Sequence, residues 1–568
     1  MRERRCSESG DAWRRGLGTA RFYAVAAQKA TGLWPGIRER RRLGRSIGEP
    51  VTLRRATVVL VLLSVTSTDR VYAQCPDGAP PPCRTATRPV SVPAPNSVAV
   101  LYFDNLSPDT GDAYLAEGLT EAITARLGQI ERLIVKSQTA VRRTRGTATD
   151  VPDALSRRLG VSYLVSGTVR RISDQVRIAV ELVRGTGGLR MWGEHYERKP
   201  NDWLAVEEEI AREVARAIAG KLLPEERAVL AQRPTRSPEA YDRFLQANHF
   251  YAQRTPRGTL RSIEHYEAAL RFDPRFVAAL VRMSLSYDQF LTRDWDYPGL
   301  TRDTVLARAV WAADRALQLD STSAEAWIAR AQILARRAPR TLEGAIPAIR
   351  RALAVDPKSA EAWHLYAVLL RNLGDDSTSV AAFRQTLAID PDRPATLALF
   401  AWRRIVDRLP LEAMRLADSA LALDPGLYLA YAPRALAHLY AGDTVAARAD
   451  AETARRLSPP GYTLYADVAS ALVEAALDHR AAGREHLERH LTAALAQPST
   501  TGERESLVAM GLVSLGESER ALDLLERAPK TSLVGFALRF PAFDPLRSNP
   551  RFQRLVEEVG WADPSGSL

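Results

Sequence analysis

The stretch LAVDPKSAEAWHLYAVLLRNLGDDSTSVAAFRQTLAIDP, residues 353–391, opens and closes on nearly the same five residues. LAVDP at 353–357 returns as LAIDP at 387–391 and again as LALDP at 421–425, so that Asp356, Asp390 and Asp424 are 34 residues apart. An internal period of this length indicates stacked supersecondary units, because one unit cannot bury its apolar face alone. The period predicts an all-α solenoid over this part of the chain.

The copies share residue types as well as spacing. In one copy Trp363 is at position 4, Phe383 at position 24 and Pro391 at position 32. Other copies keep a small alanine at position 27, as at Ala269, Ala420 and Ala454. Small alanines let neighbouring helices approach closely, and Pro ends the second helix of a pair. The pattern resembles tetratricopeptide repeats and implies superhelical stacking of helix pairs.

The array has expected limits and one irregularity. We expect about eight helix pairs over 237–530, of which the last two are degenerate. The repeat that contains LTRDWDYPG, 291–299, is lengthened by an insertion. Residues 531–568 are expected to form a C-terminal cap on the final repeat.

Residues 97–222 alternate between strand-like and helix-like segments. SVAVLYFDNLSPD, 97–109, is a short apolar run that breaks into turn residues, and the segment 112–130 has apolar residues four apart, as on one helix face. A short strand and a short helix follow. The turn signals SDQ and GTGG then separate three alternating runs, and an amphipathic segment ends the region. The order β-α-β-α-β-β-β-α predicts a small α/β domain with an antiparallel meander.

Two of these stretches resemble the TolB amino-terminal-type domain. They are SVAVLYFDNLSPDTGDAYLAEGLTEAITARL and LGVSYLVSGTVRRISDQVRIAVELVRGTGGLRMWGEHYER, with Tyr102 where that family usually has Pro. Such domains precede tetratricopeptide repeats in bacterial chains, sometimes together with adenylate cyclase or protein kinase modules. The resemblance implies a domain type and no catalytic role. Cyclase and kinase motifs are absent from this sequence.

The basic character of the chain is concentrated at its start. Residues 1–73 contain 15 Lys and Arg against 6 Asp and Glu, a net of +9 out of +11 for the whole chain. The remainder is near neutral, which argues against nucleic acid as a partner. We expect the Arg-rich residues 1–50 to be a disordered tail or to precede the true start.

Residues 51–73 have the layout of a secretory signal peptide. Arg54 and Arg55 precede the apolar run ATVVLVLLSV, 56–65, and VYA ends at Ala73. The apolar run is about half of the roughly 20 residues that a membrane span needs. We expect cleavage after Ala73 and a periplasmic or secreted protein. An uncleaved inner-membrane anchor is the alternative.

The next segment, 74–96, is expected to be a Pro-rich linker. Cys75 and Cys83 lie close together in it. Export would place them in an oxidising compartment, where we expect a small disulfide loop, with free thiols as the alternative.

Motifs that carry chemistry are sparse. The sequence has no P-loop, no G-x-S-x-G elbow and no H-E-x-x-H. His486 and His490 have a metal-ligand spacing, but their charged neighbours favour a solvated face. Five tryptophans are scattered over domains and repeats, which favours core packing over an aromatic cage: Trp192, Trp203, Trp311, Trp327 and Trp363.

The polar end of the first strand is the remaining candidate for chemistry. Asp104, Asn105, Asp109 and Asp112 could form a carboxylate cluster. A turn followed by a helix capped by Asp109 or Asp112 explains the same residues without a ligand, and this interpretation is favoured.

These observations predict a non-enzymatic interaction scaffold without cofactor or metal. A concave groove of the solenoid would hold a protein or peptide partner, and the α/β domain would dock a partner or the envelope. Repeat phase places Arg330, Arg371 and Arg404 on inner helices, where they would favour an acidic or C-terminal carboxylate ligand. A membrane-anchored cytoplasmic regulatory module and an enzyme that uses the carboxylates of 104–112 are the alternatives.

Overall fold

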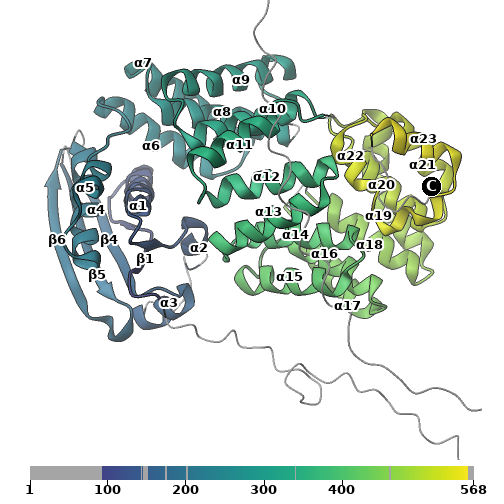
Figure 1. The fold of residues 1–568 in the computed structure, drawn as a ribbon, viewed down its shortest axis with the longest axis horizontal. Coiled ribbons are helices and arrows are strands. Elements are labelled where there is room, and N and C mark those ends of the chain that lie inside the picture. The colour runs from purple at the N-terminus through teal and green to yellow at the C-terminus, as the bar shows by residue number, and fades with distance from the viewer. Residues whose placement is uncertain are drawn as a thin grey trace, which may run out of the picture. The chain divides into compact units, whose positions relative to one another are not determined.

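The computed structural model describes residues 93–560, except 143, 145–150, 173–174, 200–201, 294, 340 and 460–461. The basic start, the expected signal peptide, Cys75 and Cys83 lie outside the described residues. Within them, a small domain with a mixed sheet precedes an all-α array (Figure 1). The predicted fold class is therefore confirmed.

The α/β domain is built on a mixed sheet. Strand β1 (Ser97–Val100) runs parallel to β3 (Ile134–Val135) on one side and to β4 (Tyr163–Ile172) on the other. β4, β5 (Gln175–Arg184) and β6 (Arg190–Arg198) form the predicted antiparallel meander.

The apolar run that begins at Ser97 is shorter as a strand than its sequence suggests. β1 ends at Val100, and the chain pairs with β4 again through the two-residue β2 (Asp104–Asn105). Phe103 lies between them and is buried. Gly167 in β4 makes room for its ring, because a Cβ at Gly167 would lie 2.6 Å from the Phe103 Cε2 atom.

Helices cover both faces of this sheet. The alternating burial of β5 places Val176, Ile178, Val180 and Leu182 in one core cluster with α1 (Ala113–Gly128) and α4 (Trp203–Ala219). A smaller cluster joins β1 to α2 (Gln138–Arg142) and α3 (Pro152–Leu159). Helix α5 (Pro224–Leu230) leads toward the array. The sequence pattern does not predict α2 or α5, which are too short to show a helical period.

The described part of the array contains eight helix pairs. The long connection from Thr292 to Arg302 is the insertion expected near 291–299. The pairs are α6 (Pro238–Ala252) with α7 (Pro256–Phe272), α8 (Val277–Thr292) with α9 (Arg302–Leu319), α10 (Ala324–Arg337) with α11 (Ala345–Val355), α12 (Ala360–Leu373) with α13 (Asp376–Ile389), α14 (Pro394–Val406) with α15 (Pro410–Leu423), α16 (Tyr428–Tyr440) with α17 (Thr444–Leu457), α18 (Leu464–Ala476) with α19 (Arg480–Ala496), and α20 (Glu503–Ser514) with α21 (Ser518–Arg527).

The recurring Asp of the repeat builds the turn between pairs. Asp356 follows α11 in an extended conformation, and its Oδ1 accepts a hydrogen bond from the Lys358 N–H at 3.0 Å. Ser359 then caps α12 by accepting from the Ala362 N–H at 3.2 Å. The same aspartate turn recurs at Asp273, Asp320, Asp390 and Asp424. The 34-residue period is therefore the period of this turn.

Three short elements follow the last pair. They are α22 (Ser532–Ala537), the 3-10 helix η4 (Pro541–Leu546) and α23 (Pro550–Glu558). Helix α23 packs on α21, where Arg551 Nη2 contacts Asp523 at 2.6 Å and Glu526 at 2.7 Å. Helix α22 instead packs against α12 and α20. Among the described residues, no helix combines the length and apolar character that a bilayer crossing requires.

Candidate functional site

The polar segment after β1 forms turns, as favoured from the sequence. Asn105 Oδ1 accepts from the Ser107 N–H at 3.0 Å, and Asp109 Oδ1 accepts from the Gly111 N–H at 2.7 Å. Asp112 stands at the N-cap position of α1 but makes no side-chain capping bond. Its Oδ1 lies 3.2 Å from Arg171 Nη1 instead. No cluster of three His, Cys, Asp or Glu suited to a metal occurs in the part of the chain that the structure describes.

The two histidines of α19 have different surroundings. His490 Nε2 lies 2.9 Å from Asp467 Oδ2 in α18. Burial acts to raise the pKa of Asp467, but hydrogen bonds from His490 and Thr463 outweigh it and lower the pKa to about 2. Burial lowers the pKa of His486. His490 thus serves a helix–helix contact in this structure.

The aromatic residues at position 4 of the repeats have a structural role. Trp363 Nε1 donates to the Pro357 carbonyl at 2.9 Å, and Trp327 Nε1 donates to the Ser321 carbonyl at the same distance. The Tyr431 hydroxyl makes the equivalent bond to the Pro425 carbonyl at 3.0 Å. Each ring therefore ties a helix to the turn before it.

The other tryptophans do not gather into one site. Trp203 is buried in the α/β core and Trp192 packs at its edge, whereas Trp311 is 58% exposed on α9.

The structure places the three predicted binding arginines in different environments. Arg330 is half-buried, lies over the Trp327 ring, and contacts Asp314 at 2.6 Å. Arg434 lies in the same way over Tyr431 and contacts Asp418, so this arrangement recurs with the repeat. Protein binding by Arg330 stays a prediction.

Arg371 and Arg404 are covered by the protein's own chain. Arg371 is 7% exposed and its guanidinium lies 4.5 Å from the Phe536 ring centroid. Arg404 is 6% exposed and contacts Asp407 at 2.8 Å and Glu412 at 3.2 Å. Neither side chain can reach a partner in this conformation.

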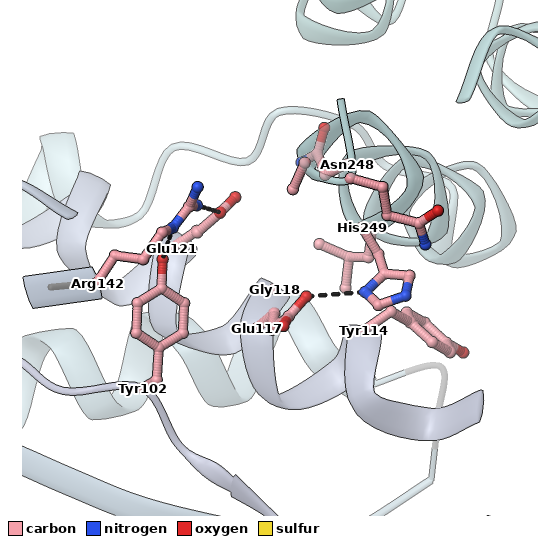
Figure 2. A pocket seen from close by; sticks show the side chains of 11 residues that line it. Tyr102, Tyr114, Glu117, Gly118, Glu121, Arg142, Asn248 and His249 are labelled. Atoms are coloured by element: carbon pink, nitrogen blue, oxygen red, sulfur yellow. Dashed lines mark hydrogen bonds and ion pairs between the residues drawn. The ribbon is translucent and has the colours of Figure 1, made fainter. Parts of the chain in front are cut away.

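A cavity of about 220 Å³ lies between α1 and the second half of α6 (Figure 2). The two helices approach closely at Gly118, where a Cβ would lie 2.8 Å from Leu245 Cδ2. Tyr102 and Arg142 add side chains from the sheet edge and from α2. The cavity therefore joins the α/β domain to the first helix of the array.

Charged side chains of the cavity are paired with one another. Glu117 Oε2 lies 2.8 Å from His249 Nδ1. Arg142 Nε donates to the Tyr102 hydroxyl at 3.1 Å, and its Nη2 lies 4.0 Å from Glu121 Oε1. Burial raises the pKa of Glu121, while Arg282 and Arg142 act to lower it.

The chemistry open to this cavity is limited by its size and its pairing. A carboxylate beside a histidine can exchange protons, as in general acid–base catalysis. However, the cavity is smaller than the roughly 300 Å³ at which small-molecule pockets begin. Glu117 and His249 also connect two helices, and this contact positions α1 on α6. We interpret the cavity as a polar joint between the domain and the array.

A buried polar network lies next to this joint. Arg126 in α1 donates from Nη1 to the carbonyl of Leu230 at 2.6 Å and to that of Gln232 at 3.0 Å. Its Nη2 lies 3.8 Å from Glu207 Oε2 in α4, and Tyr241 in α6 donates to the same carboxylate. Three helices thus meet around a single buried carboxylate.

Sequence reasoning missed both the cavity and the network. Glu117 and His249 are 132 residues apart, and Glu207 and Tyr241 are 34 apart on different helices. The available signal was a polar residue on an otherwise apolar helix face, as at Glu207 in α4.

Comparisons with known proteins reach only parts of the chain. The chain matches no known protein-family model. It is 31% identical over 242 residues to a protein named putative adenylate cyclase 3 from Rhizobium meliloti (strain 1021). That similarity covers 43% of this chain, and the chain spans 40% of that protein's length.

Solved structures that resemble part of the chain are repeat proteins. They include a tetratricopeptide repeat protein from Parabacteroides merdae ATCC 43184 (14% identity, 57% of this chain and 99% of that chain, TM-score 0.32). Others are the type IV pilus biogenesis factor PilW (19%, 40% and 96%, 0.32) and a thermophilic repeat protein, TTC0263, of Thermus thermophilus (17%, 35% and 99%, 0.30). The tetratricopeptide-type architecture of this chain rests on its helix pairs and their 34-residue period.

Proposed function

We propose that the chain is a non-enzymatic interaction scaffold whose repeat array holds a protein or peptide partner. The stack of eight helix pairs supports this proposal, because such a stack presents the first helix of each pair along one continuous surface. The α/β domain, which we propose to be of the TolB amino-terminal type, would dock a second partner or the cell envelope.

Charged side chains on successive first helices support a binding surface there. Burial acts to lower the pKa of Arg282 in α8, but Tyr266 and Glu325 of α10 raise it. Burial acts to raise the pKa of Glu361 in α12, but Arg393 before α14 and Arg282 lower it. These mutual effects mean that charges of four consecutive pairs lie near one another. We call Arg282, Glu325, Glu361 and Arg393 the inner charged row.

The inner charged row suggests the chemistry of the partner. Arg282 and Arg393 would pair with an acidic side chain or a C-terminal carboxylate. Arg330, the least buried of the three arginines singled out from the sequence, would add a contact at the rim. Contacts of this kind are charge-assisted, so we expect binding to weaken as salt rises.

The test is partner capture by the full chain, followed by cross-linking and mass spectrometry. Arg282→Glu should lower capture at least tenfold, because it reverses a charge in the row. Arg216→Glu, on the exposed side of α4, is the matched control and should leave capture unchanged. Equal capture by both variants would contradict a binding role for the inner charged row.

Export is the second part of the proposal. The signal-peptide layout of residues 51–73 supports it, and mass spectrometry of the mature protein tests it. A protein that begins at Gln74 is the expected result, and one that retains residue 1 would contradict export. In the exported protein, Cys75 and Cys83 should react with a thiol reagent only after reduction.

The alternative is a membrane-anchored regulatory module of the kind that accompanies cyclases. The 31% identity to a putative adenylate cyclase favours this alternative, although it covers less than half of either protein. A retained N-terminus together with membrane fractionation would support the regulatory module over the exported scaffold.

A further inference from the structure

The segment Thr531–Leu546, which we call the C-terminal plug, contacts helix pairs that are distant in sequence. The Ser532 N–H and hydroxyl both donate to the Pro339 carbonyl, at 3.0 and 2.7 Å, across 193 residues. Helix α22 packs on α12 of the fourth pair and on α20 of the eighth. Only beyond the plug does α23 cover the last helix, α21. The plug and the cap are therefore separate features.

Aromatic side chains anchor the plug on the array. Phe536 and Phe540 are 5% and 2% exposed. The Phe540 ring stands edge-on to Trp402 of α14, with 5.7 Å between centroids. Phe536 is covered by the guanidinium of Arg371 from α12. The plug thus fills a surface formed by the first helices of pairs four and five.

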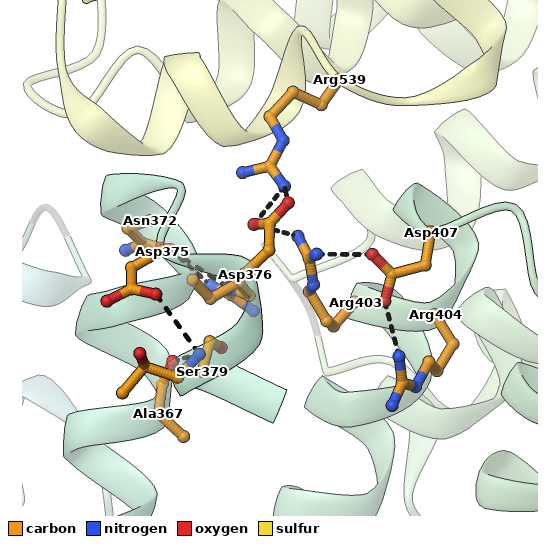
Figure 3. Close-up of polar contacts among 11 residues, drawn as sticks. Ala367, Asn372, Asp375, Asp376, Ser379, Arg403, Arg404, Asp407 and Arg539 are labelled. Atoms are coloured by element: carbon orange, nitrogen blue, oxygen red, sulfur yellow. Dashed lines mark hydrogen bonds and ion pairs between the residues drawn. The ribbon is translucent and has the colours of Figure 1, made fainter. Parts of the chain in front are cut away.

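An arginine between these aromatics completes the contact (Figure 3). Arg539 donates to both carboxylate oxygens of Asp376 at the start of α13. Asp376 also lies 2.8 Å from Arg403 Nη1, and Arg403 Nη2 donates to Asp407 at 2.5 Å. The plug therefore inserts a cation into an existing row of arginines and aspartates.

The covered surface has the composition of a binding face. Arg371, Arg403 and Arg404 lie on first helices and are nearly inaccessible, although arginine is rarely buried in a core. Without the plug, Arg371 would lose its Phe536 cover and Arg403 would face Asp376 alone. Charged groups combined with a large aromatic residue, here Trp402, are typical of protein-binding surfaces.

The contact is also imperfect in ways that make it displaceable. Among the described residues, Arg403 Nε and Arg539 Nη1 are buried without a hydrogen-bond partner. Burial lowers the pKa of Arg539, and Arg403 acts in the same direction, while Asp376 opposes them. Buried charges that are incompletely paired reduce the net stability of a contact.

We propose that the C-terminal plug occupies a peptide-docking surface on α12 and α14 as an intramolecular ligand, and that this surface accepts segments with an arginine between two aromatic residues. The proposal rests on the scaffold function and adds its regulation. While the plug is docked, this surface is closed, and a partner of the same chemistry must displace it. Arg371 and Arg404, predicted from the sequence to bind a partner, become accessible only then.

The experiment uses the full chain and a fluorescent peptide with the sequence of residues 531–546, TSLVGFALRFPAFDPL. Arg539→Ala in the chain removes the charged anchor of its own plug. The peptide should bind this variant at least tenfold more tightly than the wild-type chain, as measured by fluorescence anisotropy. A peptide that itself carries Arg539→Ala should bind both chains weakly. Equal binding of the two peptides, or of the two chains, would overturn the proposal.

Hydrogen exchange provides a second measurement that distinguishes a plug from a piece of core. In the Arg539→Ala chain, exchange should accelerate in residues 531–546 and stay unchanged in α12 and α14. The matched control is Arg551→Ala, which loosens α23 and should not admit the peptide. Loss of protection throughout α12 and α14 would mean that the segment is an integral part of the array, and would overturn the proposal.

The two proposals can fail separately. If the peptide does not bind while Arg282-dependent capture persists, the plug is not a ligand and the scaffold function stands. If the peptide binds but Arg282→Glu leaves capture unchanged, the plug inference stands and the inner charged row is not the partner site.

Discussion

The Tyr241 hydroxyl in α6 lies 2.9 Å from each carboxylate oxygen of Glu207 in α4. Glu207 is 1% exposed, and it connects the α/β domain to the first repeat. Burial raises the pKa of Glu207 to about 8, although Arg126 and Tyr241 act to lower it. This joint therefore prefers a protonated carboxyl near neutral pH.

Glu207→Gln should flatten the dependence of stability on pH. The folded pKa exceeds the usual value of 4.5, so between about 4.5 and about 8 the folded state binds a proton that the unfolded state lacks. The Glu207 contribution is present below pH 4.5 and is lost as pH rises through 8, with a slope of up to about 1.4 kcal/mol per pH unit. Urea unfolding at pH 5 to 8 measures it. The exposed Glu197→Gln is the control, and identical slopes in the two variants would refute the prediction.

Asp104→Asn should change neither stability nor partner capture, because Asp104 is exposed in β2. Asp112→Asn should lower the free energy of unfolding by about 1 kcal/mol or less, since it weakens the partly exposed pair with Arg171. Thermal melting and capture by the full chain test both. Loss of capture at an unchanged melting temperature would point to a ligand site in this loop.

Gly167→Ala should destabilise the α/β domain by about 1–3 kcal/mol, as overpacking does. The added Cβ would lie 2.5 Å from the Ala179 carbonyl oxygen and 2.6 Å from Phe103. Gly128→Ala at the end of α1 is the control, because a Cβ there meets nothing within 4 Å. Chemical denaturation compares the two, and equal stability would show that the sheet tolerates the methyl group.

Phe383→Ala should cost the array about 3–5 kcal/mol. Phe383 in α13 is fully buried and stacks on Phe400 of α14 with 5.0 Å between ring centroids. Trp311→Ala removes a larger side chain that is 58% exposed, and should change stability by about 0.5 kcal/mol or less. A comparable loss in both variants, measured by denaturant unfolding, would contradict the role of Phe383 in the core.

Local signals predicted the fold well because they repeat. Every 34 residues the same aspartate turn and small alanine return, and each copy reports the same geometry. The meander was equally visible, since its strands alternate in burial along their length. The end of β1 was less visible, because Leu101 to Phe103 remain apolar after the strand pairing is interrupted.

The candidate sites depend on contacts between distant residues, and no local pattern encodes them. Glu117 meets His249 across 132 residues, and Arg539 meets Asp376 across 163. Repeat phase correctly placed Arg371 and Arg404 on first helices, but it contains no information about what covers them. Phe536, which covers Arg371, lies in a segment that no longer follows the period.

The position of Phe540 against Trp402 has a consequence for biosynthesis. Translation delivers Thr531 about 125 residues after Val406, the last residue of α14. At roughly 5–20 residues per second, the ribosome needs on the order of ten seconds to cover that distance. During this interval the nascent array carries an uncovered tryptophan beside unpaired arginines, so this is the stage at which a chaperone would recognise it.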